Sequence, residues 1–241
     1  MVDWLSARPI AHRGLHDAAQ GIIENTATAI TAAINADYGI EVDLQVTANG
    51  EAVVHHDDRL ERLTEGSGRI DQYTSAELKR VPFKNTSDRM LTLAELCELV
   101  GGRAVLLVEM KSRFDGDRRL ARHVADILSG YSGPLAAMSF DAAQIGMLRE
   151  YAPSLRRGAV AERHVRRTGD HAEISGGWNL TSLFRARPQF VAYALRDFPA
   201  AAPLLAGMLR LPVLTWTVRS KEDQRRARRW ADQIIFEGFL P

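Results

Sequence analysis

The sequence contains very little cysteine: Cys97 is the only one among 241 residues. A single cysteine excludes an intramolecular disulfide and a metal site built from several thiolates. Cys97 follows Leu93 and Leu96 at helical spacing, a pattern that predicts a buried structural thiol.

Long apolar runs and an excess of one charge are also absent. Nowhere do about 18 apolar residues follow one another, as a membrane span requires, and the first residues lack the basic and apolar regions of a secretory signal. The 31 basic and 30 acidic residues nearly cancel, so no global field favours nucleic acid or a membrane surface. We therefore expect a cytoplasmic protein with a small-molecule partner, and the oligomeric state stays open.

One cluster of like charge stands out near the end of the sequence. Arg225, Arg226, Arg228 and Arg229 lie within five residues of one another. At helical spacing such a run is typical of a solvated helix face, and we prefer that interpretation to a binding patch.

Short apolar segments alternate with longer amphipathic ones. Eight segments are predicted as strands, at residues 8–11, 40–44, 103–110, 135–139, 155–160, 190–194, 212–218 and 232–236. Helical patterns separate most of them, and the one starting at Thr92 carries a Thr-x-x-Glu capping box with Glu95. Repeated strand–helix units over this length predict an α/β protein, a single (β/α)₈ barrel domain over residues 1–241, rather than an open sheet.

Two stretches do not fit a plain barrel. Residues 47–90, after the second strand, are too many for a simple strand–helix connection and contain an Asn49-Gly50 hairpin signal. We expect them to form a small inserted lobe over the barrel mouth. Residues 162–187 are weakly periodic and contain a break at Gly176-Gly177, so no elements are assigned there.

Acidic side chains occur at the predicted carboxyl ends of the strands, where the active sites of such barrels lie. Glu41 and Asp43 are two residues apart on a strand, so both face the same side about 7 Å apart. Glu109 ends the next barrel strand. Three carboxylates suit a hard divalent cation such as Mg²⁺, Ca²⁺ or Mn²⁺, although Glu-x-Asp alone also fits exposed strand-end charges.

Basic and imidazole side chains occupy the same predicted edge. His12, Arg13 and Gly14 follow the first strand, and Lys111 follows the third. Arginine is suited to phosphate and glycine allows close backbone approach. A lone histidine is more often a structural core residue, but with two cations and a carboxylate set it indicates an anionic, phosphate-like substrate.

These motifs together resemble the glycerophosphodiester phosphodiesterase family. The resemblance is carried, in order and spacing, by His12-Arg13-Gly14, Glu24-Asn25-Thr26, Glu41-x-Asp43, Val53-Val54-His55-His56-Asp57-x-x-Leu60-x-Arg62, Glu109-x-Lys111, Ser139-Phe140-Asp141 and Trp216-Thr217-Val218. It extends from His12 to Val218 and fades between Glu162 and Tyr193. Each motif alone is weak, whereas their common order is specific.

The resemblance implies a function and a set of site residues. It implies a metal-dependent hydrolase of lipid and glycerol metabolism that converts glycerophosphodiesters to glycerol 3-phosphate and an alcohol, with catalytic histidines at His12 and His56. The cation would be held by Glu41, Asp43 and Glu109. Substrate-binding positions would be Arg13 and Lys111 for phosphate, Glu24 and Asn25 lining the pocket, and Trp216 against the substrate.

The match has one ambiguity and one departure. Of the adjacent His55 and His56, only one can face the site, and the spacing to Asp57 and Arg62 selects His56, leaving His55 as structural. Similar proteins often end in Thr-Asp-x-Pro where this sequence has Phe236-Glu237-Gly238, so no role is assigned to Glu237. The remaining histidines match nothing and are expected at structural or surface positions: His16, His123, His164 and His171.

We expect catalysis through acid–base chemistry by the two histidines, by way of a cyclic phosphate, with the cation and the two basic side chains neutralising charge. Which histidine is the base is left open. Two alternatives are a phospholipase D-like enzyme acting on lysophospholipids and a non-catalytic phosphoester-binding barrel.

Overall fold

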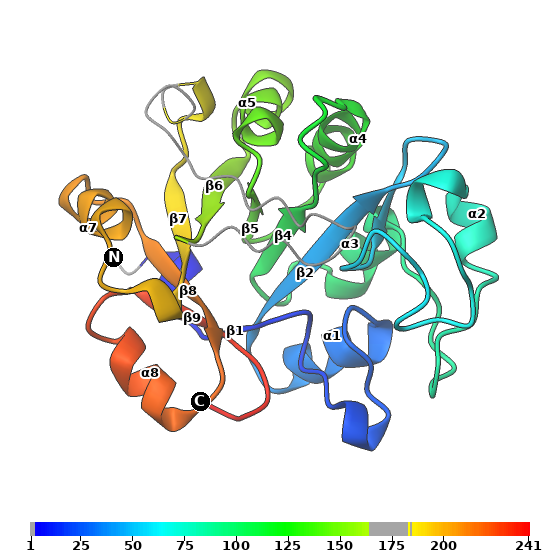
Figure 1. The fold of residues 1–241 in the computed structure, drawn as a ribbon, viewed down its shortest axis with the longest axis horizontal. Coiled ribbons are helices and arrows are strands. Elements are labelled where there is room, and N and C mark those ends of the chain that lie inside the picture. Colours follow the sequence, from blue (N-terminus) through cyan, green and yellow to red (C-terminus); the bar gives the residue numbers. More distant parts are fainter. Residues whose placement is uncertain (1–2, 164–182, 184) are drawn as a thin grey trace.

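Eight parallel strands form a closed barrel in the computed structural model, which describes residues 3–163, 183 and 185–241 (Figure 1). The strands are β1 (Ile10–Ala11), β2 (Gly39–Val46), β4 (Leu106–Met110), β5 (Leu135–Ser139), β6 (Arg156–Ala161), β7 (Phe190–Ala194), β8 (Val213–Val218) and β9 (Gln233–Phe236). The sheet closes because β1 pairs in parallel with both β2 and β9. The expected (β/α)₈ barrel is confirmed, with a strand at each of the eight predicted places.

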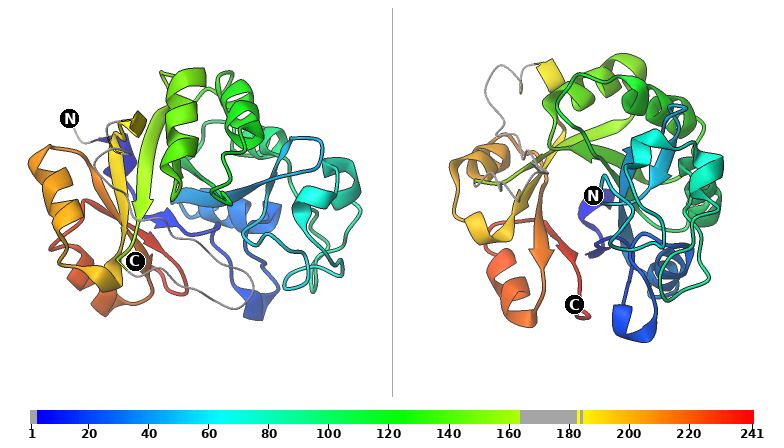
Figure 2. Two further views of the ribbon diagram at one scale, coloured as in Figure 1. Left: turned by 45° about the horizontal axis from the view of Figure 1, so that its top comes forward. Right: turned by 45° about the vertical axis from the view of Figure 1, so that its right-hand side comes forward.

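Helices surround the barrel, as the views in Figures 1 and 2 show. They are α1 (Ala27–Asn35), α3 (Leu93–Val100), α4 (Arg119–Leu128), α5 (Ala142–Tyr151), α7 (Ala201–Met208) and α8 (Lys221–Ala227). Short 3-10 turns are η1 (Trp4–Ser6), η2 (Ala18–Gln20), η3 (Ile70–Gln72) and η4 (Leu195–Asp197). The Thr92–Glu95 capping box begins α3 as predicted.

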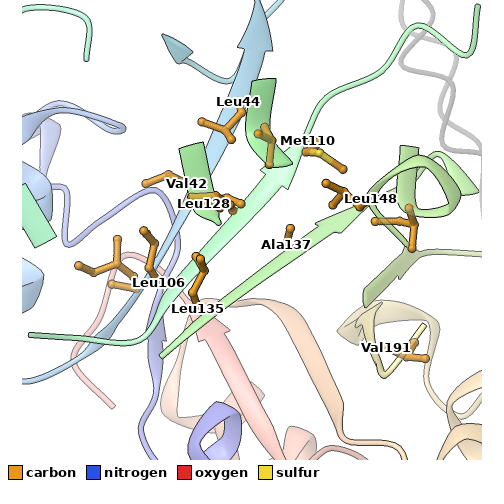
Figure 3. Close-up of a cluster of buried hydrophobic side chains, with 14 of the residues drawn as sticks. Val42, Leu44, Leu106, Met110, Leu128, Leu135, Ala137, Leu148 and Val191 are labelled. Carbon is orange, nitrogen blue, oxygen red and sulfur yellow. The ribbon is translucent and has the colours of Figure 1, made fainter. Parts of the chain in front are cut away.

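The barrel has two hydrophobic layers because successive strand residues face opposite ways. Val42, Leu44 and Leu106 belong to the large cluster between strands and helices (Figure 3). An inner cluster fills the barrel and includes Leu107 and Phe190. The odd-numbered positions of β2 and β4 therefore face inward.

A segment inserted between β2 and α3 has a small hydrophobic cluster of its own. The hairpin turn at Gly50, with φ +83°, joins β2 to the antiparallel strand β3 (Ala52–Val54). The short helix α2 (Ser75–Leu78) follows, and the cluster is built from Ile23, Val53, Leu60, Ile70, Leu78, Phe83 and Met90. We propose that residues 47–90 form a lobe on a single barrel domain.

Several sequence expectations concern residues outside the barrel core. The four arginines at 225, 226, 228 and 229 are exposed as predicted. Cys97 is only half-buried against the outer core, and burial raises its thiol pKa to about 11. No helix among the described residues is long and apolar enough to cross a membrane. His164, His171 and most of the weakly periodic stretch lie outside the described residues.

Candidate active site

Three buried carboxylates meet at the carboxyl ends of neighbouring strands. Glu41 and Asp43 extend from β2, and Glu109 on β4 pairs in register with Asp43. Exposed fractions are 1% for Glu41, 1% for Asp43 and 7% for Glu109. One oxygen from each lies within 4.8 Å of the others. Like charges this close repel one another unless cations compensate them.

Lys111 compensates two of the three carboxylates. Its Nζ lies 2.8 Å from Asp43 Oδ1 and 2.6 Å from Glu109 Oε1. Burial opposes the ammonium charge, but the two carboxylates outweigh it and raise the pKa of Lys111. Burial likewise opposes ionisation of Asp43, yet Lys111, His56 and Arg13 hold its pKa well below the ordinary value.

Of the three carboxylates, Glu41 is the one whose negative charge the neighbouring groups neutralise least. Burial, and then the charges of Asp43 and Glu109, raise its pKa. Its Oε2 accepts a hydrogen bond from the backbone N–H of Arg13 at 3.0 Å. Its Oε1 is buried and has no hydrogen-bond partner within the described part of the chain. A buried carboxylate with one oxygen lacking a partner, beside two other carboxylates, is a donor set that fits a hard divalent cation.

The loop from β1 to α1 is held against these carboxylates. Arg13 and Asn25 adopt left-handed backbone conformations, with φ +58° and +60°. Asn25 Nδ2 donates to Asp43 Oδ2 at 2.9 Å, and Asn25 Oδ1 accepts from the Asp43 backbone N–H at 3.2 Å. Asn25 is fully buried and does not line the cavity. Its two hydrogen bonds instead orient the Asp43 side chain.

Glu24 joins the same loop to the inserted lobe. Arg13 Nη1 donates to Glu24 Oε1 at 2.7 Å, while Arg62 donates to both Glu24 oxygens at 2.8 and 3.0 Å. Burial would raise the pKa of Glu24, but the two guanidinium groups lower it to about 2. Arg13 Nε lies 3.3 Å from Asp43 Oδ2. Arg13 is thereby held with its guanidinium group at the carboxylate cluster.

His12 and His56 each have a carboxylate on Nδ1. His12 Nδ1 lies 2.5 Å from Glu237 Oε2, and His56 Nδ1 lies 2.7 Å from Asp57 Oδ1. His12 Nε2 lies 3.9 Å from Glu41 Oε2. Neither Nε2 hydrogen-bonds to a described protein group, and both rings line the same cavity. Each imidazole can therefore offer Nε2 to a substrate.

Glu237 is the site residue that sequence reasoning missed. Its carboxylate contacts His12 and also accepts hydrogen bonds from Arg219, through Nε at 2.7 Å. Burial opposes its charge, but the bond to His12 and the charges of His12 and Arg219 act together against burial, and the pKa of Glu237 is lowered. The only sequence signal was its position after the last strand, because the surrounding residues depart from the family motif.

The cavity over these groups measures about 980 Å³. Of the predicted site residues, those lining it are His12, Arg13, Glu41, His56, Glu109, Lys111 and Trp216. Trp216 packs edge-on against Phe140, with ring centroids 5.6 Å apart. Asp43, Glu24 and Asn25 do not line the cavity and instead support residues that do.

Other polar residues near the strand ends make hydrogen bonds to the backbone that support the fold. His55 is fully buried, and its Nδ1 lies 2.9 Å from the backbone oxygen of Asp57. Asp141 caps α5 by accepting the backbone N–H of Ala143 at 2.8 Å. His16 lies closer to the site than expected, with Nε2 3.8 Å from Glu237 Oε2.

Comparison with known proteins identifies relatives along nearly the whole chain. A glycerophosphodiester phosphodiesterase of Caldanaerobacter subterraneus subsp. tengcongensis is 27% identical over 234 residues, covering 90% of this chain and 88% of that protein. A putative glycerophosphodiester phosphodiesterase of Bacillus subtilis is 31% identical over 161 residues, covering 63% and 64%.

Solved structures share the fold. A glycerophosphodiester phosphodiesterase from Thermotoga maritima has a TM-score of 0.70 at 25% identity, covering 94% of this chain and 92% of that one. An Oleispira antarctica phosphodiesterase in complex with the product sn-glycerol-3-phosphate has a TM-score of 0.79 at 20% identity, covering 97% and 94%. The model of the glycerophosphoryl diester phosphodiesterase family matches residues 12–236. The chain therefore belongs to this family and is a phosphoric diester hydrolase.

Proposed function

We propose that this enzyme hydrolyses glycerophosphodiesters to glycerol 3-phosphate and an alcohol. The observation that carries the proposal is one cavity lined by two histidines, each with a carboxylate on Nδ1, beside a buried carboxylate cluster with Arg13 and Lys111. Relatives covering most of the chain bear the name of this activity. The Oleispira antarctica neighbour was solved with sn-glycerol-3-phosphate, a product of the same class.

A divalent cation completes the proposal, because the donor set suits one. Glu41, Asp43 and Glu109 would hold Mg²⁺, Ca²⁺ or Mn²⁺ through carboxylate oxygens. Such an ion, when bound, neutralises negative charge on the phosphate oxygens. Lys111 already contacts two of these carboxylates, so it lies where a phosphate oxygen bound at the cluster would find a positive charge.

The two histidines perform the proton transfers of the proposed reaction. One Nε2 removes the proton from the substrate hydroxyl next to the phosphate-bearing carbon, and that oxygen attacks phosphorus. The other histidine donates a proton to the departing alcohol as its bond to phosphorus breaks. The attack is intramolecular and forms a five-membered cyclic phosphate, so little entropy is lost. Water then opens the ring and releases glycerol 3-phosphate.

Product analysis with and without metal tests this function. Purified protein is incubated with glycerophosphocholine and glycerol 3-phosphate is measured, first with EDTA and then with Mg²⁺, Ca²⁺ or Mn²⁺ added back. We expect turnover to disappear with EDTA and to return with at least one cation. Full activity in EDTA would contradict the metal requirement. Hydrolysis of lysophosphatidylcholine in preference to glycerophosphocholine would favour the phospholipase D-like alternative.

Single histidine variants test the chemistry. His12→Ala and His56→Ala should each lower kcat by about 10²–10⁴-fold, the usual contribution of a general acid or base. Circular dichroism and cation binding should stay unchanged, because neither ring is a proposed ligand or part of the hydrophobic core. His55→Ala controls for loss of a neighbouring buried imidazole. Near-wild-type turnover in both variants would exclude the two-histidine mechanism.

A further inference from the structure

Helix α7 carries no polar side chain, although much of it faces solvent. Residues 200–209 are all alanine, proline, leucine, glycine or methionine. Only Pro203 and Ala206 of the helix are buried. A helix that is apolar on all sides is normally covered, since an exposed apolar stripe costs free energy in water.

The exposed side of α7 is the main apolar feature on the described surface. Five large hydrophobic residues are strongly exposed on the whole described surface. Four of them lie in the α7 segment: Leu204 at 50%, Leu205 at 46%, Met208 at 81% and Leu209 at 64%. We call these four residues the α7 face. Figure 1 places α7 on the outer side of the barrel, next to α8.

The exposed charged residues in the chain segments on either side of α7 have one sign. Between residues 185 and 213, the exposed charged residues are all arginines, but Arg196 pairs with Glu162 and lines the catalytic cavity. The arginines that border the α7 face are therefore taken as Arg185, Arg187 and Arg210. The only acidic residue in that range, Asp197, is buried. Arg187 and Arg210 precede the adjacent strands β7 and β8, so they lie at the same end of the barrel as the C-terminus of α7.

These features argue against a second copy of the chain as the occupant. In a two-fold interface each α7 face would meet its own copy, and residues 185–213 expose no acidic side chain that could pair with the arginines of the other copy. An eight-residue helix is also only about 12 Å long. A stable dimer needs about 800 Å² of buried surface from each partner, more than one such helix offers.

We propose that the α7 face and its bordering arginines bind an anionic lipid surface. Leucine and methionine side chains would enter the apolar boundary of the bilayer, while the arginines contact negatively charged headgroups. The C-terminus of α7 lies at the end of the barrel opposite the catalytic cavity, because the helix returns from the carboxyl end of β7 to the start of β8. The cavity would stay open to water. This docking goes beyond the proposed reaction and does not depend on it.

Vesicle sedimentation tests the docking. Full-length protein is mixed with vesicles of phosphatidylcholine plus phosphatidylglycerol, and with vesicles of phosphatidylcholine alone. We expect binding to the anionic vesicles that weakens with added salt. Leu205→Glu combined with Met208→Glu should abolish it. Arg210→Gln should weaken it about fivefold on anionic vesicles and leave the neutral ones unaffected.

Leu240→Glu is the matched control, because Leu240 is exposed to a similar extent but lies beyond the carboxyl end of β9. It should sediment like the wild type, and all variants should hydrolyse soluble glycerophosphocholine like the wild type. Absence of vesicle binding, or binding that survives the double substitution, would overturn the proposal. A wild-type dimer that the double substitution dissociates would also overturn it, by assigning the α7 face to a second copy.

Discussion

At the scale of single residues, the catalytic centre depends on how each imidazole is held. A histidine bonded through Nδ1 has its tautomer and ring orientation set by that bond, leaving Nε2 for the substrate. Glu237 holds His12 and Asp57 holds His56 in this way. Both carboxylates are held in turn by an arginine, Arg219 for Glu237 and Arg62 for Asp57.

Glu237→Gln should slow catalysis and shift the pH profile. Burial lowers the pKa of His12, and the Glu237 carboxylate acts in the opposite direction. Removing that charge leaves burial less opposed, so the pKa of His12 falls further. The limb of the kcat profile that depends on His12 should therefore move to lower pH. The loss in kcat should reach about 10²-fold at most, less than loss of the imidazole itself.

The matched variant is Asp57→Asn, which removes the carboxylate partner of His56. It should lower kcat without moving the limb that depends on His12, because Asp57 contacts His56 and not His12. A uniform loss of activity in Glu237→Gln with no shift of either limb would assign Glu237 a purely structural role.

At the scale of elements, the site depends on a close approach between a loop and a helix. Gly14 has φ +78°, and a Cβ there would lie 2.8 Å from the carbonyl carbon of Ala29 in α1. The backbone N–H of Gly14 also donates to the carbonyl of Glu41 at 3.1 Å. Glycine thus lets the turn that carries Arg13 pack directly on α1.

Gly14→Ala should lower the free energy of unfolding by roughly 2–4 kcal/mol, combining backbone strain with a steric clash. Gly116→Ala separates the two effects, because Gly116 has φ +79° but no atom within 4 Å of an added Cβ. It should cost only about 1 kcal/mol. Urea unfolding measures both. Equal losses would show that the clash with Ala29 is relieved by movement.

At the scale of the whole molecule, the inserted lobe and the barrel share the active site. Asp57 and Arg62 belong to the lobe, whereas Glu24 and Arg13 belong to the loop after β1. Glu24 accepts hydrogen bonds from both arginines and so ties the two parts together. Its side chain is 13% exposed, while that of Arg62 is 45% exposed, so solvent weakens this link.

Glu24→Gln should therefore reduce stability in a pH-dependent way. The pKa of Glu24 is about 2 in the folded protein, below its ordinary value of 4.5. The carboxylate thus stabilises the fold above pH 4.5, and this contribution disappears as the pH falls toward 2. We expect a loss of about 1–2 kcal/mol at pH 7 after discounting for solvent. Chemical unfolding at several pH values measures the difference in free energy of unfolding between the wild type and the variant. A difference that stays constant with pH would contradict the prediction.

The sequence by itself determined the strand and helix pattern, the closed barrel and the strand-end carboxylates. These depend on local periodicity, which also indicates which side chains of β2 and β4 share a face. The family resemblance named residues that line the cavity and three that support them, and their individual roles stay predictions, as do the metal and the cytoplasmic location. Only the tertiary structure decided that Glu237 meets His12, since 225 residues separate them and no local pattern records that contact. It also decided that α7 leaves its apolar side exposed, because burial depends on packing between elements distant in sequence.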